Sequence, residues 1–100
     1  MKWLEACKAS ELAAGQPRCV EAEGGRIALF RTATGVYAID DFCPHRSGPL
    51  HQGWLTGDTV ACPWHQWVFR LEDGHCTNIP GQKVRTFPVE ERDGTLWIGV

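Results

Sequence analysis

Long apolar segments and an excess of basic residues are absent from this sequence of 100 residues, and helical periodicity is scarce. No stretch approaches the roughly 20 consecutive apolar residues that a membrane-spanning helix needs, so we expect no membrane partner. The ten Lys and Arg are scattered and outnumbered by twelve Asp and Glu, which argues against a nucleic-acid partner. The first ten residues lack a continuous apolar run, and a cytoplasmic location is the default expectation.

Internal repeats, low-complexity segments and glycine-rich nucleotide-binding motifs are also missing. The length predicts a single domain, residues 1–100, with no room for a second catalytic domain. Apolar residues make up 43% of the chain and charged residues 22%, which is typical of an ordinary globular protein.

Short apolar or alternating segments separated by glycine turns predict an all-β fold of small antiparallel sheets, as a sandwich or a small barrel. The expected strands are residues 26–31, 35–40, 58–62, 67–71 and 96–100. Asp73-Gly74 and Asp93-Gly94 favour hairpin turns, and Gly24-Gly25 favours another tight turn. Only residues 8–15 suggest a helical turn, with Ser10 as its cap and Gly15 as its stop.

Five cysteines, an odd number, fit a disulfide framework poorly, so we expect some thiols to stay reduced and some to hold metal. Residues 43–67, CPHRSGPLHQGWLTGDTVACPWHQW, carry the metal-site pattern. Proline and glycine between the ligands predict rigid loops at strand ends, over about residues 42–67. The candidate metal ligands are Cys43, His45, Cys62 and His65.

Two kinds of metal site accept two thiolates and two imidazoles. A structural zinc module would bind them as a tetrahedron, but zinc sequences usually group the two cysteines in one knuckle and the two histidines on a helix. A binuclear iron–sulfur cluster explains the interleaved order better, because one Cys and one His from each loop let both loops reach both irons.

Cys43-Pro44-His45, followed after sixteen residues by Cys62-Pro63-Trp64-His65, resembles the signature of Rieske [2Fe–2S] proteins. The similarity extends from about Ile27 to Ile98. It implies an all-β Rieske-type fold of three small antiparallel sheets, with a [2Fe–2S] cluster at the tip of two loops. It also implies that the two cysteines bind one iron and the two histidines the other.

The sequence departs from respiratory Rieske proteins at two places. Gly48 and Trp64 stand where those proteins carry two further cysteines, so the disulfide that braces their cluster cannot form. Gln66 and Trp67 follow His65, where those proteins have a glycine and a hydrogen-bonding serine. Because fewer hydrogen bonds to sulfur stabilise the reduced state less, we expect a potential near the low end of the roughly −150 to +300 mV Rieske range.

The resemblance implies a ferredoxin that transfers one electron to a redox partner, more a component or subunit of an oxidoreductase than an enzyme by itself. The sequence looks most similar to the small subunit of assimilatory NAD(P)H nitrite reductase. The alternative is the ferredoxin component of an aromatic-ring dioxygenase. The partner would be a flavin- or sirohaem-containing reductase, or an oxygenase.

Several other residues have weaker claims to a role. Cys7, Cys19 and Cys76 are expected to be buried or half-buried free thiols. His51 is interpreted as a solvated loop residue, with a place in a docking surface as the alternative. Three tryptophans either cover the cluster or pack in the core: Trp54, Trp64 and Trp67.

Overall fold

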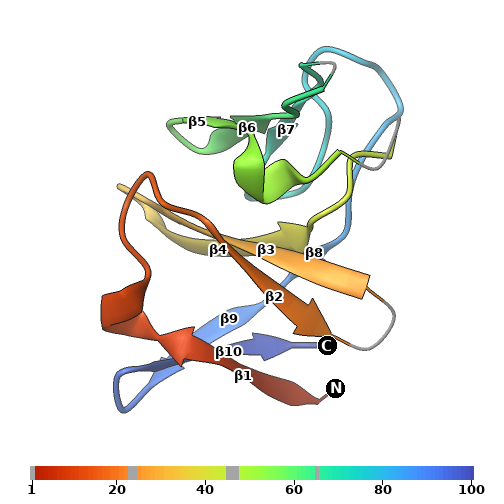
Figure 1. The fold of residues 1–100 in the computed structure, drawn as a ribbon. Coiled ribbons are helices and arrows are strands. Elements are labelled where there is room, and N and C mark those ends of the chain that lie inside the picture. The colour runs from red at the N-terminus through yellow and green to blue at the C-terminus, as the bar shows by residue number, and fades with distance from the viewer. Residues whose placement is uncertain (1, 23–24, 45–47, 65) are drawn as a thin grey trace.

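The computed structural model describes residues 2–22, 25–44, 48–64 and 66–100, and over these ranges the chain forms three antiparallel sheets (Figure 1). The first sheet has the order β1-β10-β9 and comprises Trp3–Lys8, Thr95–Gly99 and Val89–Arg92. The second has the order β2-β3-β4-β8 and comprises Arg18–Ala22, Gly25–Thr32, Gly35–Asp40 and Thr86–Phe87. The third has the order β5-β6-β7 and comprises Trp54–Thr56, Thr59–Ala61 and Val68–Arg70.

The second sheet is the middle layer, because strand β3 contributes to two separate hydrophobic clusters. Ala28 and Phe30 pack in the cluster shared with the β5-β6-β7 sheet. Ile27 and Leu29 pack in the cluster shared with β1 and β10. Successive side chains of a strand point to opposite faces, so a strand covered on both faces is continuously apolar. That requirement explains the uninterrupted apolar run at residues 27–30, and it places the β5-β6-β7 sheet on one side of the middle layer (Figure 1).

The all-β expectation and its small antiparallel sheets are confirmed, with three sheets in place of a two-sheet sandwich. The strand predicted at residues 35–40 is β4, and the Asp93-Gly94 turn joins β9 to β10. Asp93 and Gly94 have φ of 51° and 78°, the positive values that a type I′ turn needs. Strands β1, β2, β5, β8 and β9 were not predicted. They range from six residues in β1 to two in β8.

Two local predictions were wrong in detail. The expected helical turn is a single 3₁₀ turn, Ala9–Glu11, in which Ser10 is internal and the Lys8 backbone N–H donates to the Glu11 carboxylate at 3.0 Å. Gly74 does adopt a positive φ of 77°, but the segment after it makes only isolated bridges and no strand, so no regular hairpin forms there. Gly24 of the predicted Gly24-Gly25 turn lies outside the described residues.

The two ends of the described chain pair with each other. The backbone N–H of Lys2 donates to the carbonyl of Val100 at 2.9 Å, and that of Val100 donates to Lys2 at 2.7 Å. This pairing lies at the first sheet, across the middle layer from the β5-β6-β7 sheet (Figure 1). Within the described residues, no helix has the length and apolar character needed to cross a membrane.

Candidate metal centre

Two tight loops position the cysteines of the predicted metal site. The first follows β4 and ends at a second 3₁₀ turn, η2, Leu50–Gln52. The second joins β6 to β7. The backbone N–H of Cys43 donates to the Gly48 carbonyl at 3.0 Å, and that of Cys62 donates to the Trp67 carbonyl at 2.8 Å. Each cysteine backbone is therefore fixed by a hydrogen bond that closes its own loop.

The thiols of Cys43 and Cys62 both face the interior, since each residue is only 1% exposed. Both belong to the hydrophobic cluster between the middle layer and the β5-β6-β7 sheet, together with Leu50, Val60 and Phe69. None of the five cysteines, all of which are described, forms a disulfide. Two reduced thiols from different loops in one dry environment are the donor set that an iron–sulfur cluster uses.

The first loop passes so close to Cys62 that any side chain at residue 48 would press against the Cys62 sulfur. A Cβ on Gly48 would lie 2.7 Å from the Cys62 Sγ and 3.3 Å from the nearest ring atom of Trp64. Gly48 and Trp64, which replace the bridging cysteines of respiratory Rieske proteins, therefore face each other across the two loops. The glycine lets the first loop approach the thiol of the second, and the indole fills part of the space beside it.

His45 and His65 lie outside the described residues, so the structure does not test their predicted role. Their described neighbours Pro44, Trp64 and Gln66 are all exposed. Gln66 has φ of 57°, a left-handed conformation that costs a non-glycine residue roughly 1–2 kcal/mol. This strain arises at the position where respiratory Rieske proteins have glycine.

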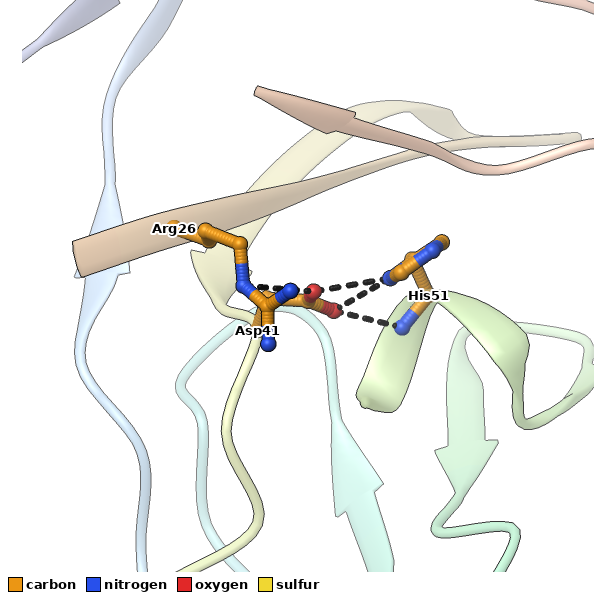
Figure 2. Close-up of polar contacts among 3 residues, drawn as sticks. All are labelled: Arg26, Asp41 and His51. Carbon is orange, nitrogen blue, oxygen red and sulfur yellow. Dashed lines mark hydrogen bonds and ion pairs between the residues drawn. The ribbon is translucent and has the colours of Figure 1, made fainter. Parts of the chain in front are cut away.

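Asp41 closes the base of the first loop, and sequence reasoning missed it. Its carboxylate is fully buried. It accepts the backbone N–H of His51 at 2.7 Å on Oδ1, and the ring Nδ1 of His51 lies 2.7 Å from Oδ2 (Figure 2). The backbone carbonyl of Asp41 accepts the N–H of Leu50 at 3.1 Å, while its own N–H donates to Arg26 at 3.0 Å. One residue thus joins strand β3 to both ends of the loop that carries Cys43.

The interpretation of His51 as a solvated residue was wrong. Its side chain is 20% exposed, and its ring turns inward to the Asp41 carboxylate, which lies between His51 and Arg26 (Figure 2). Loops usually run over the surface, and that general tendency misled the prediction. A signal was available in the acidic residue two positions before Cys43, directly after a buried strand, because a buried carboxylate requires partners.

The free-thiol prediction for the remaining cysteines is confirmed: Cys7 is buried and Cys19 and Cys76 are half-buried. Burial raises the pKa of Cys7. Burial, and then its hydrogen bond to Asp41, raise the pKa of Cys19 to about 11.

The core alternative holds for Trp67 and fails for the other two tryptophans, whose predicted place over the iron–sulfur cluster stays a prediction. Trp54 and Trp64 are each 57% exposed, so neither is a core residue. Trp67 packs against the cluster that contains Cys43 and Cys62.

Comparison with known proteins gives a consistent result. Residues 2–88 match the family model described as Rieske [2Fe–2S] domain. The chain is 37% identical to cholesterol 7-desaturase nvd of Drosophila melanogaster over 96% of its length, but it spans only 24% of that protein. It is 34% identical to the ferredoxin component of the naphthalene 1,2-dioxygenase system of Pseudomonas putida, covering 90% of this chain and 88% of the relative.

A solved structure agrees with the sequence relatives. It is a complex of reduced oxygenase and oxidized ferredoxin in carbazole 1,9a-dioxygenase, and one of its chains superimposes with a TM-score of 0.90 at 31% identity. The match covers 97% of this chain and 92% of that one. The fold is therefore shared at close to full length.

Proposed function

The chain belongs to the Rieske [2Fe–2S] domain family, and from this premise we propose that it is a one-electron carrier that passes electrons to an oxygenase. Its cofactor is a [2Fe–2S] cluster, which supplies a centre that gains and loses one electron at a time. The observation that carries the proposal is the match to the naphthalene dioxygenase ferredoxin component, which covers nearly all of both chains.

The proposed cluster ligands are Cys43 and Cys62 for one iron and His45 and His65 for the other. Burial of both cysteines in one apolar cluster supports the thiolate half of this assignment. Leu50, Val60 and Phe69, all fully buried, exclude water from the sulfur side. A dry, apolar surrounding is one of the factors that set the potential of an iron–sulfur centre.

The tip of the two loops supplies the surface at which a partner would approach. Pro44, Trp64 and Gln66, the described neighbours of the two histidines, are exposed there. Trp64 offers an exposed aromatic ring, a residue type that is enriched at protein interfaces. We therefore place electron exit at this tip, on the side away from the buried thiols.

An oxygenase is a better supported acceptor than a nitrite reductase. The proteins named above are a cholesterol desaturase, a dioxygenase ferredoxin component and a complex of an oxygenase with its ferredoxin, and none of them is a nitrite reductase subunit. The alternative to the leading prediction from the sequence, a ferredoxin component, is thus the one we adopt. A flavin-containing reductase remains our proposed electron donor.

A second candidate function is the electron-entry domain of a larger oxidoreductase. The identity of 37% to cholesterol 7-desaturase nvd over 96% of this chain favours it. In both cases the cluster and its ligands do the same work, and the difference is whether the acceptor lies on another polypeptide.

Stopped-flow mixing under anaerobic conditions tests the proposal. The reduced protein is mixed with the oxygenase component of naphthalene 1,2-dioxygenase, with the large subunit of an assimilatory nitrite reductase, or with albumin, and recovery of the visible absorption is followed. We expect re-oxidation by the oxygenase at a rate that rises with its concentration. Re-oxidation by the nitrite reductase alone would restore the nitrite-reductase interpretation, and a colourless protein without iron would refute both.

A further inference from the structure

Three side chains that could bind a metal meet at the base of the first cysteine loop, and none of them is a proposed cluster ligand. Cys19 lies in β2, Asp41 follows β4, and His51 lies in η2. The Sγ of Cys19, a carboxylate oxygen of Asp41 and a ring nitrogen of His51 all lie within 4.8 Å of one another. No spacing in the sequence relates these residues, and only the pairing of β2, β3 and β4 brings them together.

The Asp41 carboxylate holds the His51 imidazole in place. Its Oδ1 accepts the backbone N–H of His51 at 2.7 Å, and the ring Nδ1 lies 2.9 Å from Oδ1 and 2.7 Å from Oδ2. The thiol of Cys19 lies beside the same carboxylate, with its Sγ within 4.8 Å of an Asp41 oxygen. One fully buried carboxylate therefore orients the His51 imidazole (Figure 2), and the Cys19 thiol lies close to both groups.

A thiolate, a carboxylate and an imidazole together match the preference of zinc and similar divalent cations. Zn²⁺ binds such ligands at about 2.0–2.3 Å in a tetrahedron, which sets neighbouring ligand atoms about 3.3–3.5 Å apart. In the structure the three candidate ligand atoms lie within 4.8 Å of one another, and the His51 Nδ1 and the Asp41 Oδ2 are 2.7 Å apart. The spacing that a tetrahedral zinc ion needs falls between these two distances. Insertion of the ion needs Nδ1 and Oδ2 to separate by about 0.6 Å, and a side-chain rotation of His51 can supply this.

We propose that Cys19, Asp41 and His51 form a metal site separate from the cluster, which takes one zinc-like divalent cation and leaves its fourth position to water. The ion bonds to Sγ, Oδ2 and Nδ1. The thiol proton passes to solvent, and a proton on Nδ1 is replaced by one on Nε2. The backbone hydrogen bond from His51 to Oδ1 is retained.

Charge and access are both compatible with this site. The thiolate and the carboxylate neutralise a dication. The nearby guanidinium of Arg26, whose Nε lies 3.9 Å from Oδ2, opposes it. Arg26 is 43% exposed and stacks on Phe42 at 4.9 Å, so it has an alternative partner and room to withdraw. Cys19 is half-buried and the His51 side chain is 20% exposed, which leaves a path from solvent.

A cation bound at this site would link strand β2 to the loop that carries Cys43. Asp41 already joins the base of that loop to β3 and to His51, and Cys19 would add strand β2 to these contacts. A cation bound by the folded chain alone stabilises it by mass action, so the melting temperature should rise with its concentration.

Zinc titration of the cluster-loaded protein tests the proposal. Adventitious metal is first removed with a chelator, Zn²⁺ binding is measured by isothermal titration calorimetry, and zinc and iron retained after desalting are measured by mass spectrometry. The test variants are Cys19→Ser and His51→Asn. The matched controls are Cys76→Ser and His75→Asn, a half-buried free thiol and an exposed imidazole elsewhere in the fold.

We expect one zinc per chain without loss of iron in the wild type and in both controls. Each test variant should bind zinc at least roughly tenfold more weakly, since even outer-shell changes cost 10–100-fold at metal sites. Cd²⁺ should produce a sulfur-to-metal charge-transfer band that Cys19→Ser lacks. Three results would overturn the site: no zinc retained by the wild type, equal affinity in the test variants and controls, or zinc uptake that displaces iron.

Discussion

Replacement of Gly48 by alanine offers the most direct test of the proposed cluster site. The added Cβ would lie 2.7 Å from the Cys62 Sγ, whereas ordinary van der Waals contact begins at 3.4 Å. The sulfur must therefore retreat by about 0.7 Å, if the loops do not move. In a protein without a cluster this shift is easy, because Sγ is the free end of a side chain. In a protein with a cluster it is not, since metal–ligand distances tolerate only about ±0.2 Å.

The cost of Gly48→Ala should consequently appear in cluster retention more than in the stability of the cluster-free fold. Overpacking of this kind costs roughly 1–3 kcal/mol. Since about 1.4 kcal/mol is a factor of ten, the equilibrium between cluster-bound and cluster-free protein should shift by about 5- to 140-fold. Iron and acid-labile sulfide per chain, together with the visible absorption, report this shift. Far-ultraviolet circular dichroism of the cluster-free protein reports the stability of the fold.

Gly94→Ala is the matched control for this experiment. Gly94 has φ of 78° and open space around its Cβ position, so alanine there strains the backbone by roughly 1–2 kcal/mol without touching either cysteine loop. It should lower the melting temperature and leave the iron content unchanged. Equal loss of iron in both variants, or full iron content in Gly48→Ala, would show that the close approach of Gly48 to Cys62 has no part in holding the cluster.

Three further predictions follow from the remaining cysteines, the histidines and the loop sequence. Serine at Cys7, Cys19 and Cys76 together should leave the visible absorption intact, whereas His65→Ala should abolish it; loss of colour in the triple variant would contradict the ligand assignment. The pKa of Cys19 is raised from 9.0 to about 11 in the folded chain. Between these two pH values the folded chain keeps a thiol proton that the unfolded chain has lost. The stabilisation that comes from the protonated Cys19 thiol is therefore present below pH 9 and is lost as the pH rises through 11. Urea denaturation should show the free energy of unfolding of the wild type falling more steeply over that window than that of Cys19→Ser, by at most about 1.4 kcal/mol per pH unit, and parallel curves would be inconsistent with it. Protein-film voltammetry should give a potential near the low end of the Rieske range, and a strongly positive value at neutral pH would overturn the argument from the missing hydrogen bonds.

Local patterns predicted those parts of the fold that depend on local chemistry. The Asp93-Gly94 turn was predictable because two successive positive φ values favour this dipeptide. Strand β3 was predictable from its apolar run, although burial on both faces could be seen only in the structure. Strand β8 could not be predicted, since two residues carry no period and their conformation depends on pairing with Ala38 and Ile39 of β4.

In the candidate site, too, the sequence predicted the features that depend on local spacing and missed those that depend on contacts between distant segments. The spacing of the Cys-His pairs led to the prediction of four ligands, which stays a prediction, and the burial of Cys43 and Cys62 agrees with its cysteine half. The family match supports the predicted cluster type. The approach of Gly48 to Cys62 depends on two loops meeting across a sheet, which no sequence window contains. The burial of Asp41 escaped prediction for the same reason: its partner His51 folds back onto it through η2.

The adjoining chain ends have a consequence for how such a domain can be used. Because Lys2 and Val100 are paired across the first sheet, a host polypeptide could enter and leave the domain at one point. Proximity of ends is what makes insertion and circular permutation tolerable. A graft at that point leaves the opposite pole, with its two cysteines, undisturbed, which is compatible with matches both to a relative of nearly this chain's length and to one about four times as long.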